Sequence, residues 1–86
     1  MSKLAEVKEL TEKGKQKLIQ EAVKGALAEG NAATLVLDTM ISAMGIVGDK
    51  FKRSEIFVPE MLMAAHTMKK GVEVLQPLLA GQASVS

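Results

Sequence analysis

The sequence has no cysteine, tryptophan or tyrosine, and its single histidine is His66. Without cysteine, the chain can form neither disulfides nor thiolate metal sites. A metal site needs several ligands at suitable spacing, and the sequence supplies none around His66. The nearest neighbours also include no carboxylate that could orient the imidazole for catalysis. We therefore expect His66 to be a structural residue on the flank of a helix.

An excess of charge of either sign is absent as well. Eleven Lys and Arg residues face ten Asp and Glu residues, and the net charge of +1 does not indicate a nucleic-acid partner. No apolar run approaches the roughly 20 residues that a membrane-spanning helix needs. The N-terminus lacks the basic stretch and apolar run of a signal peptide. We therefore expect a cytoplasmic protein.

Apolar side chains, in contrast, are abundant and make up 48% of the 86 residues. This length suffices for one domain, and a domain so small buries only a modest fraction of its surface. The excess of apolar surface therefore predicts a partner, which is a second copy, another domain or a ligand.

Apolar residues recur at helical spacing along the whole chain, and valine and isoleucine show no strand-like alternation. Residues typical of helix ends divide this pattern into four predicted helices, about Lys3 to Lys13, Lys15 to Glu29, Ala32 to Lys52, and Pro59 onward. The second should bury one broad apolar face, formed by Leu18, Ile19, Ala22, Val23, Ala26 and Leu27. The third is apolar on more than one side and should be the most buried. The predicted fold is an all-α four-helix bundle with short connections.

The residues between the predicted helices are typical of helix ends. Gly14 ends the first helix, Gly30 suits the C′ position of the second, and Asn31 is a natural N-cap for the third. In the fourth helix, Pro59 suits the first turn, whereas Pro77 removes a backbone donor and predicts a kink. A heptad-like seam of this helix should face the bundle, made of Met61, Ala65, Met68, Val72, Leu75 and Leu79.

No catalytic constellation is present in the sequence. Gly45 and Gly48 do not form a phosphate-binding loop, because no strand precedes them and no Gly-Lys-Ser/Thr follows. The acidic residues that could act as acid or base lie on different turns, namely Asp38, Asp49, Glu55 and Glu60. We therefore assign no enzymatic activity to this chain.

The most informative segment runs from Met44 to Pro59. It places both phenylalanines, Phe51 and Phe57, within seven positions of each other. Interaction with a helix C-terminus explains the basic cluster in this segment without an anionic partner: Lys50, Lys52 and Arg53. Apart from the first residue, every methionine lies between Met40 and Met68, where core filling is the expected role for most of them.

A recurring pattern runs through this segment and the fourth helix: Met44, Val47-Gly48, Phe51, Glu55, Phe57, Pro59, Ala64-Ala65, Met68 and Val74-Leu75-Gln76-Pro77-Leu78-Leu79. It resembles the N-terminal helical module of corrinoid (cobalamin-binding) proteins, over roughly Leu18 to Gly81. That family includes the cap of cobalamin-dependent methionine synthase and the corrinoid proteins of methylamine, methanol and methoxyaryl methyltransferase systems. The order of glycine, aromatic, proline and alanine pair makes the motif specific.

The resemblance implies a non-catalytic helical cap that shields the upper face of the corrin and the methyl–cobalt bond of a methyl carrier. Such a lid must exclude water and also move aside for methyl transfer. By motif position, Phe51 would be the principal lid residue and Val58 its companion, whereas Phe57 would anchor the loop in the bundle. The implied cofactor-binding set also includes Met44 and Val47.

The sequence departs from the family in two ways. Thr39, Ser42 and Ala43 stand where relatives often carry glycine and proline–glycine, which favours a more continuous third helix. The family's α/β domain, whose DxHxxG motif supplies the lower cobalt ligand, is not in this chain. We expect residues 1–81 to form the cap-like bundle, and residues 82–86 to be a tail or the start of a linker to that cobalamin-binding domain.

The resemblance implies cobalamin as the cofactor of the full-length protein, with no tight binding by this chain alone. The implied partners are the cobalamin-binding α/β domain and methyltransferase subunits, and an isolated module can also pair with itself as a homodimer. The alternative is a stand-alone helical interaction or oligomerisation module without a cofactor. The apolar content and the heptad-like fourth helix suit that alternative too.

Overall fold

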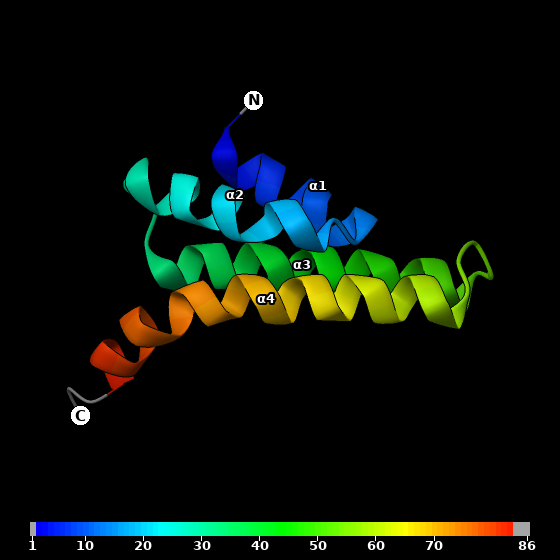
Figure 1. Ribbon diagram of the computed structural model, residues 1–86. Helices are drawn as coiled ribbons and strands as arrows, with labels where there is room; N and C mark the ends of the chain where they lie inside the picture. Colours follow the sequence, from blue (N-terminus) through cyan, green and yellow to red (C-terminus); the bar gives the residue numbers. More distant parts are fainter. Residues whose placement is uncertain (1, 84–86) are drawn as a thin grey trace.

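The computed structural model describes residues 2–83, with side chains described for residues 2–80, and these residues form four α-helices. The helices are α1 (Lys3–Lys13), α2 (Gln16–Ala28), α3 (Ala33–Lys52) and α4 (Val58–Ala83). They form two layers, α1 with α2 and α3 with α4 (Figure 1). Both α1 and α4 pack on α2 and α3, whereas the diagonal pairs α1–α4 and α2–α3 contact each other less. The described residues contain no strand, and the predicted all-α four-helix bundle is confirmed.

The core lies between the two layers and is built from one face of each helix. Its largest fully buried apolar side chains are Ile19, Met40, Leu75, Val7, Val23, Val36 and Val47. Most of the apolar face predicted for α2 is buried, but Leu18 near its start is exposed. By share of buried residues, α2 (four of 13) exceeds α3 (five of 20), so the expectation that α3 is the most buried helix is wrong. The buried residues of α3 form a single stripe and leave Leu35 and Ile41 exposed. The bundle therefore keeps apolar surface on its outside.

The line of α4 that faces the core consists of Ala64, Thr67, Gly71 and Leu75. The predicted seam is displaced by one residue over most of its length, since Ala65 is exposed and Met68 only half-buried. Gly71 explains the displacement. A Cβ atom at Gly71 would lie 2.7 Å from Met40 Sδ and 3.2 Å from Ile19 Cγ1. Even a methyl group at this position would force the buried Met40 side chain to move, so glycine suits the close approach of α4 to its neighbours.

Three helices end with a residue in the left-handed backbone region, and these residues are Gly14 (φ +69°), Gly30 (φ +97°) and Ser54 (φ +61°). After each of them, the next N–H donates to a carbonyl five residues earlier. The donor–acceptor distances are 2.9 Å from Lys15 to Leu10, 3.3 Å from Asn31 to Ala26, and 2.8 Å from Glu55 to Lys50. This is the Schellman arrangement, which satisfies carbonyls that the helix itself leaves unpaired.

The start of α3 differs from the prediction. Asn31 does not cap this helix, because its Nδ2 donates to the Ala26 carbonyl at 2.9 Å and so closes the end of α2 instead. Ala32 takes the N-cap position without a side-chain hydrogen bond. Further along, α3 continues without interruption through Ser42 and Ala43, as the lack of glycine and proline there predicts.

Ser54 is the one non-glycine residue with positive φ in the described part of the chain. The left-handed conformation costs an L-residue about 1–2 kcal/mol, and glycine avoids this cost. Ser54→Gly should therefore raise the free energy of unfolding by about 1 kcal/mol, as measured by urea denaturation. The control is Ser42→Gly at an exposed position inside α3, which should lower it because glycine weakens a helix interior. Destabilisation by both substitutions would contradict the prediction.

Pro77 lies inside α4 without ending it. Figure 1 shows the C-terminal turns of α4 bending away from α3, as the missing N–H of a proline predicts. The helix continues to Ala83, past the domain boundary expected at residue 81, and residues 84–86 of the predicted tail lie outside the described residues. Among residues 2–83, no helix is long and apolar enough to cross a membrane.

Candidate functional site

The corner between α3 and α4 is a short turn held by polar contacts. Ser54 closes the end of α3, and α4 begins after Phe57, whose N–H donates to Glu60 Oε1 at 3.0 Å. This bond is one half of a capping box, in which a first-turn glutamate satisfies a backbone donor at the helix start. Arg53 Nε and Glu55 Oε2 form an ion pair at 3.3 Å on the exposed side. Hydrogen bonds and an ion pair therefore hold the turn, while Phe57 stays exposed.

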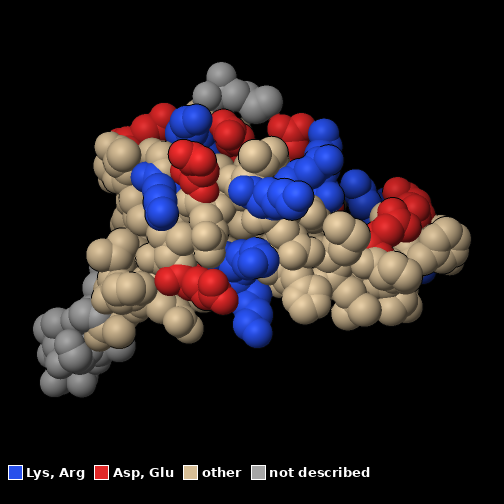
Figure 2. Space-filling model, viewed as in Figure 1, with Lys and Arg blue, Asp and Glu red and all other residues tan. Residues whose placement is uncertain are grey.

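Several apolar side chains at this corner are exposed to solvent. Phe57 is 70% exposed, Val58 49% and Phe51 39%. One turn further along α4, Leu62 and Met63 are each about half exposed. Figure 2 shows a field of uncharged side chains at the lower right, where the corner lies, with charged side chains above it. Large apolar side chains gathered on a surface mark an interaction site, and the corner is therefore the candidate site.

The other predicted site residues lie in different environments. Met44 is half-buried on α3, two turns before Phe51. Val47 lies one turn before Phe51 and is only 1% exposed, so its side chain belongs to the core. The structure thus brings Phe51, Phe57 and Val58 together at the surface and places Val47 beneath it.

The expectation that Phe57 anchors the loop in the bundle is wrong. Its neighbour Ile56 is partly buried instead and lines a hollow together with Val47. The sequence reasoning also missed Leu62 and Met63. Leu62 follows Val58 by four residues, and this spacing on one side of a helix could have revealed it.

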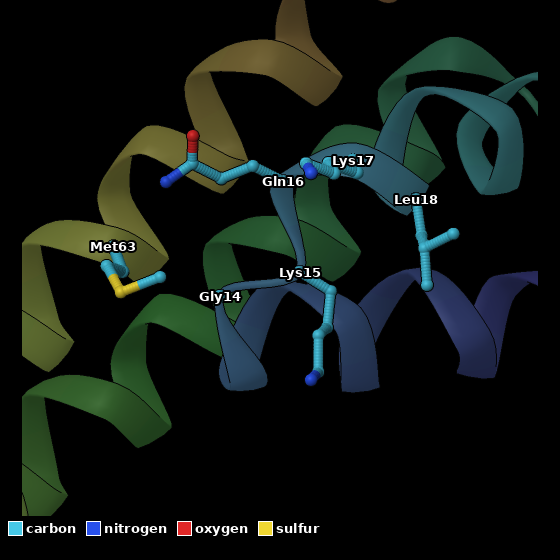
Figure 3. A pocket seen from close by; sticks show the side chains of 6 residues that line it. All are labelled: Gly14, Lys15, Gln16, Lys17, Leu18 and Met63. Atoms are coloured by element: carbon cyan, nitrogen blue, oxygen red, sulfur yellow. The ribbon is translucent and has the colours of Figure 1, made fainter.

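Beside the corner, the turn between α1 and α2 forms a shallow hollow with α4. Its volume is about 530 Å³, and its mainly apolar lining comes from Gly14, Lys15, Gln16, Lys17, Leu18 and Met63. Figure 3 shows Met63 on α4 at one end of this group, Leu18 at the other and Lys15 between them. A Cβ atom at Gly14 would lie 3.1 Å from Met63 Cβ, so glycine lets the turn approach α4. A second hollow of about 350 Å³ adjoins the first, because Met63 and Lys15 line both.

The described residues offer no ligand set for a metal. No three His, Cys, Asp or Glu side chains come together among residues 2–83. His66 is exposed on α4, where the sequence placed it. The exposed side chains of Phe51, Phe57 and Val58 offer apolar contact to a ligand.

The sequence matches a known family over most of its length. Residues 4–76 match the family described as B12 binding domain. The chain belongs to this family. Among similar proteins, trimethylamine corrinoid protein 2 of Methanosarcina acetivorans is 36% identical over 75 residues, which are 86% of this chain and 35% of that protein. Monomethylamine corrinoid protein 1 of Methanosarcina barkeri is 43% identical over 60 residues, which are 69% of this chain and 28% of that protein.

The fold is similar to a solved structure from the same group of proteins. The monomethylamine corrinoid protein of Methanosarcina barkeri matches with a TM-score of 0.83 and 33% identity, over 86% of this chain and 35% of that chain. The chain therefore spans about a third of the length of these relatives. The resemblance to the helical module of corrinoid proteins is confirmed.

Proposed function

We propose that this chain is the helical cap module of a corrinoid methyl-carrier protein, and that its α3–α4 corner shields the upper face of the corrin and the methyl–cobalt bond. One observation carries the proposal. Phe51, Val58 and Leu62 stay exposed at one corner of a chain that belongs to the B12 binding domain family. The names of the relatives, trimethylamine and monomethylamine corrinoid proteins, support a role in methyl transfer.

The residues present fit one face of cobalamin. The corrin ring is a flat macrocycle, and aromatic and aliphatic side chains can cover such a surface by apolar contact. Phe51 and Val58 offer this contact, whereas residues 2–83 contain no cluster of His, Cys, Asp or Glu that could hold a metal ion. We therefore assign contact with the upper face to this chain, and, following the family resemblance, the lower cobalt ligand to the α/β domain with its DxHxxG motif.

When bound, cobalamin supplies the cobalt that carries the methyl group. The contribution of this chain is to exclude water, because Phe51 and Val58 cover the reactive face with apolar surface. Val47 and Met44 precede Phe51 on α3 and support its position from the bundle side. Exclusion of water requires no acid, base or nucleophile, and we propose that the chain is not itself catalytic.

A lid of this kind must move away when the methyl group is transferred. The proposed partners are therefore the cobalamin-binding α/β domain, over which the cap lies, and the methyltransferase subunits that need access to the same face. A cytoplasmic location is part of this proposal.

A chimera tests the function. In it, this chain replaces the matching third of the Methanosarcina barkeri monomethylamine corrinoid protein. We expect the chimera to bind cobalamin with a shifted absorption spectrum. The 86-residue chain alone should bind it weakly or not at all, because one apolar face supplies few of the contacts.

The control is the Methanosarcina barkeri protein without its own helical module. Its methylated cofactor should lose the methyl group in light faster than that of the chimera. Tight, spectrally shifted binding of cobalamin by the 86-residue chain alone would contradict this division of roles.

A helical interaction or oligomerisation module without a cofactor is the second candidate, and the 70% exposure of Phe57 favours it. Self-association alone does not separate the candidates, because a cap without its usual neighbour exposes the same corner. The following coding sequence does separate them. A DxHxxG motif shortly after this chain would decide for the cap, since that motif supplies the lower cobalt ligand.

A further inference from the structure

The larger hollow, between the α1–α2 turn and α4, has a positively charged rim. Lys15 and Lys17 are exposed beside it, and within the described chain neither forms an ion pair. Both stand at the start of α2, where the first turn has no acidic residue and the N-cap Lys15 makes no side-chain hydrogen bond. The positive end of the helix dipole adds to the two lysines. The hollow therefore suits an apolar group that is accompanied by carboxylates.

The corner of the same chain carries such a group, although Lys52 and Arg53 also lie there and Arg53 pairs with Glu55 at 3.3 Å. Phe57 is its most exposed large apolar side chain, and Glu55 and Glu60 lie two positions before it and three after it. Both glutamates are exposed, and each carboxylate can accept more hydrogen bonds than the single contact it makes here. A hollow of about 530 Å³ has room for a phenyl ring. An aromatic side chain buries about 150–250 Å² when it is covered, so this contact is a substantial anchor.

Phe57 lies less than two helical turns along the chain from the larger hollow, because Met63 lines this hollow and follows Phe57 by six residues. The smaller hollow shares Met63 and Lys15 with the larger one, and it is also lined by Ile56, the residue before Phe57. When a protruding group and its complementary hollow adjoin, a two-fold axis between them can form both contacts at once. Each copy then inserts its own protruding group and receives that of the other copy, and the assembly closes as a dimer.

We propose that a second copy of this chain docks here in a reciprocal two-fold dimer. Phe57 of the partner subunit enters the larger hollow, and the partner subunit's Glu55 faces Lys15 and Lys17. The same contacts recur with the copies exchanged. A stable interface takes about 800 Å² from each copy. That area is about a seventh of the 5402 Å² of accessible surface on this chain, so a small part of the surface suffices.

The dimer and the proposed lid use different side chains, although both lie at the α3–α4 corner. The contacts of the dimer use Phe57 and the α1–α2 turn, whereas the proposed lid uses Phe51 and Val58. Cobalamin binding by the chimera tests the lid, and the oligomeric state of the chain tests the dimer. The failure of one proposal is therefore distinguishable from the failure of the other.

The test exchanges charges between two variants of the full chain. The hollow variant carries Lys15→Glu and Lys17→Glu, and the corner variant carries Glu55→Lys. In a dimer of either variant alone, like charges face each other in both of the two symmetric contacts. In a mixed dimer, one contact pairs the two exchanged charges, and the other contact keeps the original pair of charges. The new glutamates stand at a helix N-terminus, where negative charge is favourable, so the hollow variant should fold.

Sedimentation equilibrium at about 0.1 mM should show a dimer for the wild type, a dimer about tenfold weaker for each variant alone, and recovery in the equimolar mixture. Lys24→Glu is the matched control, because Lys24 is exposed on α2 two turns beyond Lys17 and does not line the hollow. It should leave the dimer unchanged. A monomeric wild type, variants that dimerise as well as the wild type, or a mixture without recovery would each overturn the proposal.

Phe57→Ser tests the apolar part of the contact independently of charge. It changes an exposed side chain, and serine is a favourable N-cap residue opposite Glu60, so the unfolding temperature of the monomer should not fall, while the dimer should weaken about tenfold or more. A dimer that persists in this variant overturns the proposal. Open-ended oligomers of the wild type would overturn it as well, because a two-fold contact closes after two copies.

Discussion

Replacing Gly71 by leucine should lower the free energy of unfolding by about 3 kcal/mol or more and leave much of the chain unfolded. The reason is the contact that α4 makes with two helices at this position. A Cβ atom alone would lie 2.7 Å from Met40 Sδ and 3.2 Å from Ile19 Cγ1, and both partners are fully buried. Leucine adds three more carbon atoms beyond Cβ. Because a close-packed core has no space for them, α4 would have to separate from α2 and α3.

Gly45→Leu is the matched control. Gly45 lies inside α3 with nothing within 4 Å of an added Cβ atom. Leucine there should stabilise the chain by about 0.8–1 kcal/mol, because it is a better helix former than glycine. Urea titration followed by circular dichroism gives both free energies of unfolding. If Gly71→Leu were as stable as the wild type, the close approach of α4 to Met40 would be refuted.

The ends of α1 and α2 could be predicted because glycine signals them. Gly14 and Gly30 adopt the left-handed conformation, which glycine reaches at no steric cost. Ser54 does the same at the end of α3, but serine carries no such signal. The turn before α4 was therefore recognised from Pro59, and its internal geometry was not predicted.

The displaced seam of α4 has a different cause. A hydrophobic pattern gives weight to large apolar residues such as Met68 and Val72, which end up half-buried at the edge. Close helix packing selects the smallest residues, here Ala64 and Gly71, for the central line. Spacing alone therefore indicated roughly which side of α4 faces the bundle, and the separation between the helices decided which residues lie at its centre.

The location of the candidate site could be predicted, but the direction of each side chain could not. Both phenylalanines do lie at the α3–α4 corner, as their spacing suggested. Whether Ile56 or Phe57 turns inward depends on the backbone of a turn whose left-handed residue is Ser54. The hollow beside Met63 exists because Gly14 approaches α4. This contact joins distant parts of the chain, and local sequence patterns cannot predict it.

In the chimera, Phe51→Ala should increase several-fold the rate at which light removes the methyl group from cobalamin. Under the proposed function, the ring of Phe51 would cover the methyl–cobalt bond and exclude water from it, so its removal would leave the bond less protected. Alanine removes the aromatic ring, which in this chain is 39% exposed and available to a ligand. The measurement is the absorbance of the methylated cofactor during illumination at constant intensity.

Leu35→Ala is the control for this substitution. Leu35 is also an exposed apolar residue of α3, but it lies four turns before Phe51 and away from the corner. Its truncation should leave the photolysis rate unchanged, so a general loosening of the bundle would show itself in both variants. An unchanged rate with Phe51→Ala, or equal acceleration by the two substitutions, would exclude Phe51 as the lid. Acceleration confined to Phe51→Ala would mean that its ring, rather than the bundle as a whole, protects the bond.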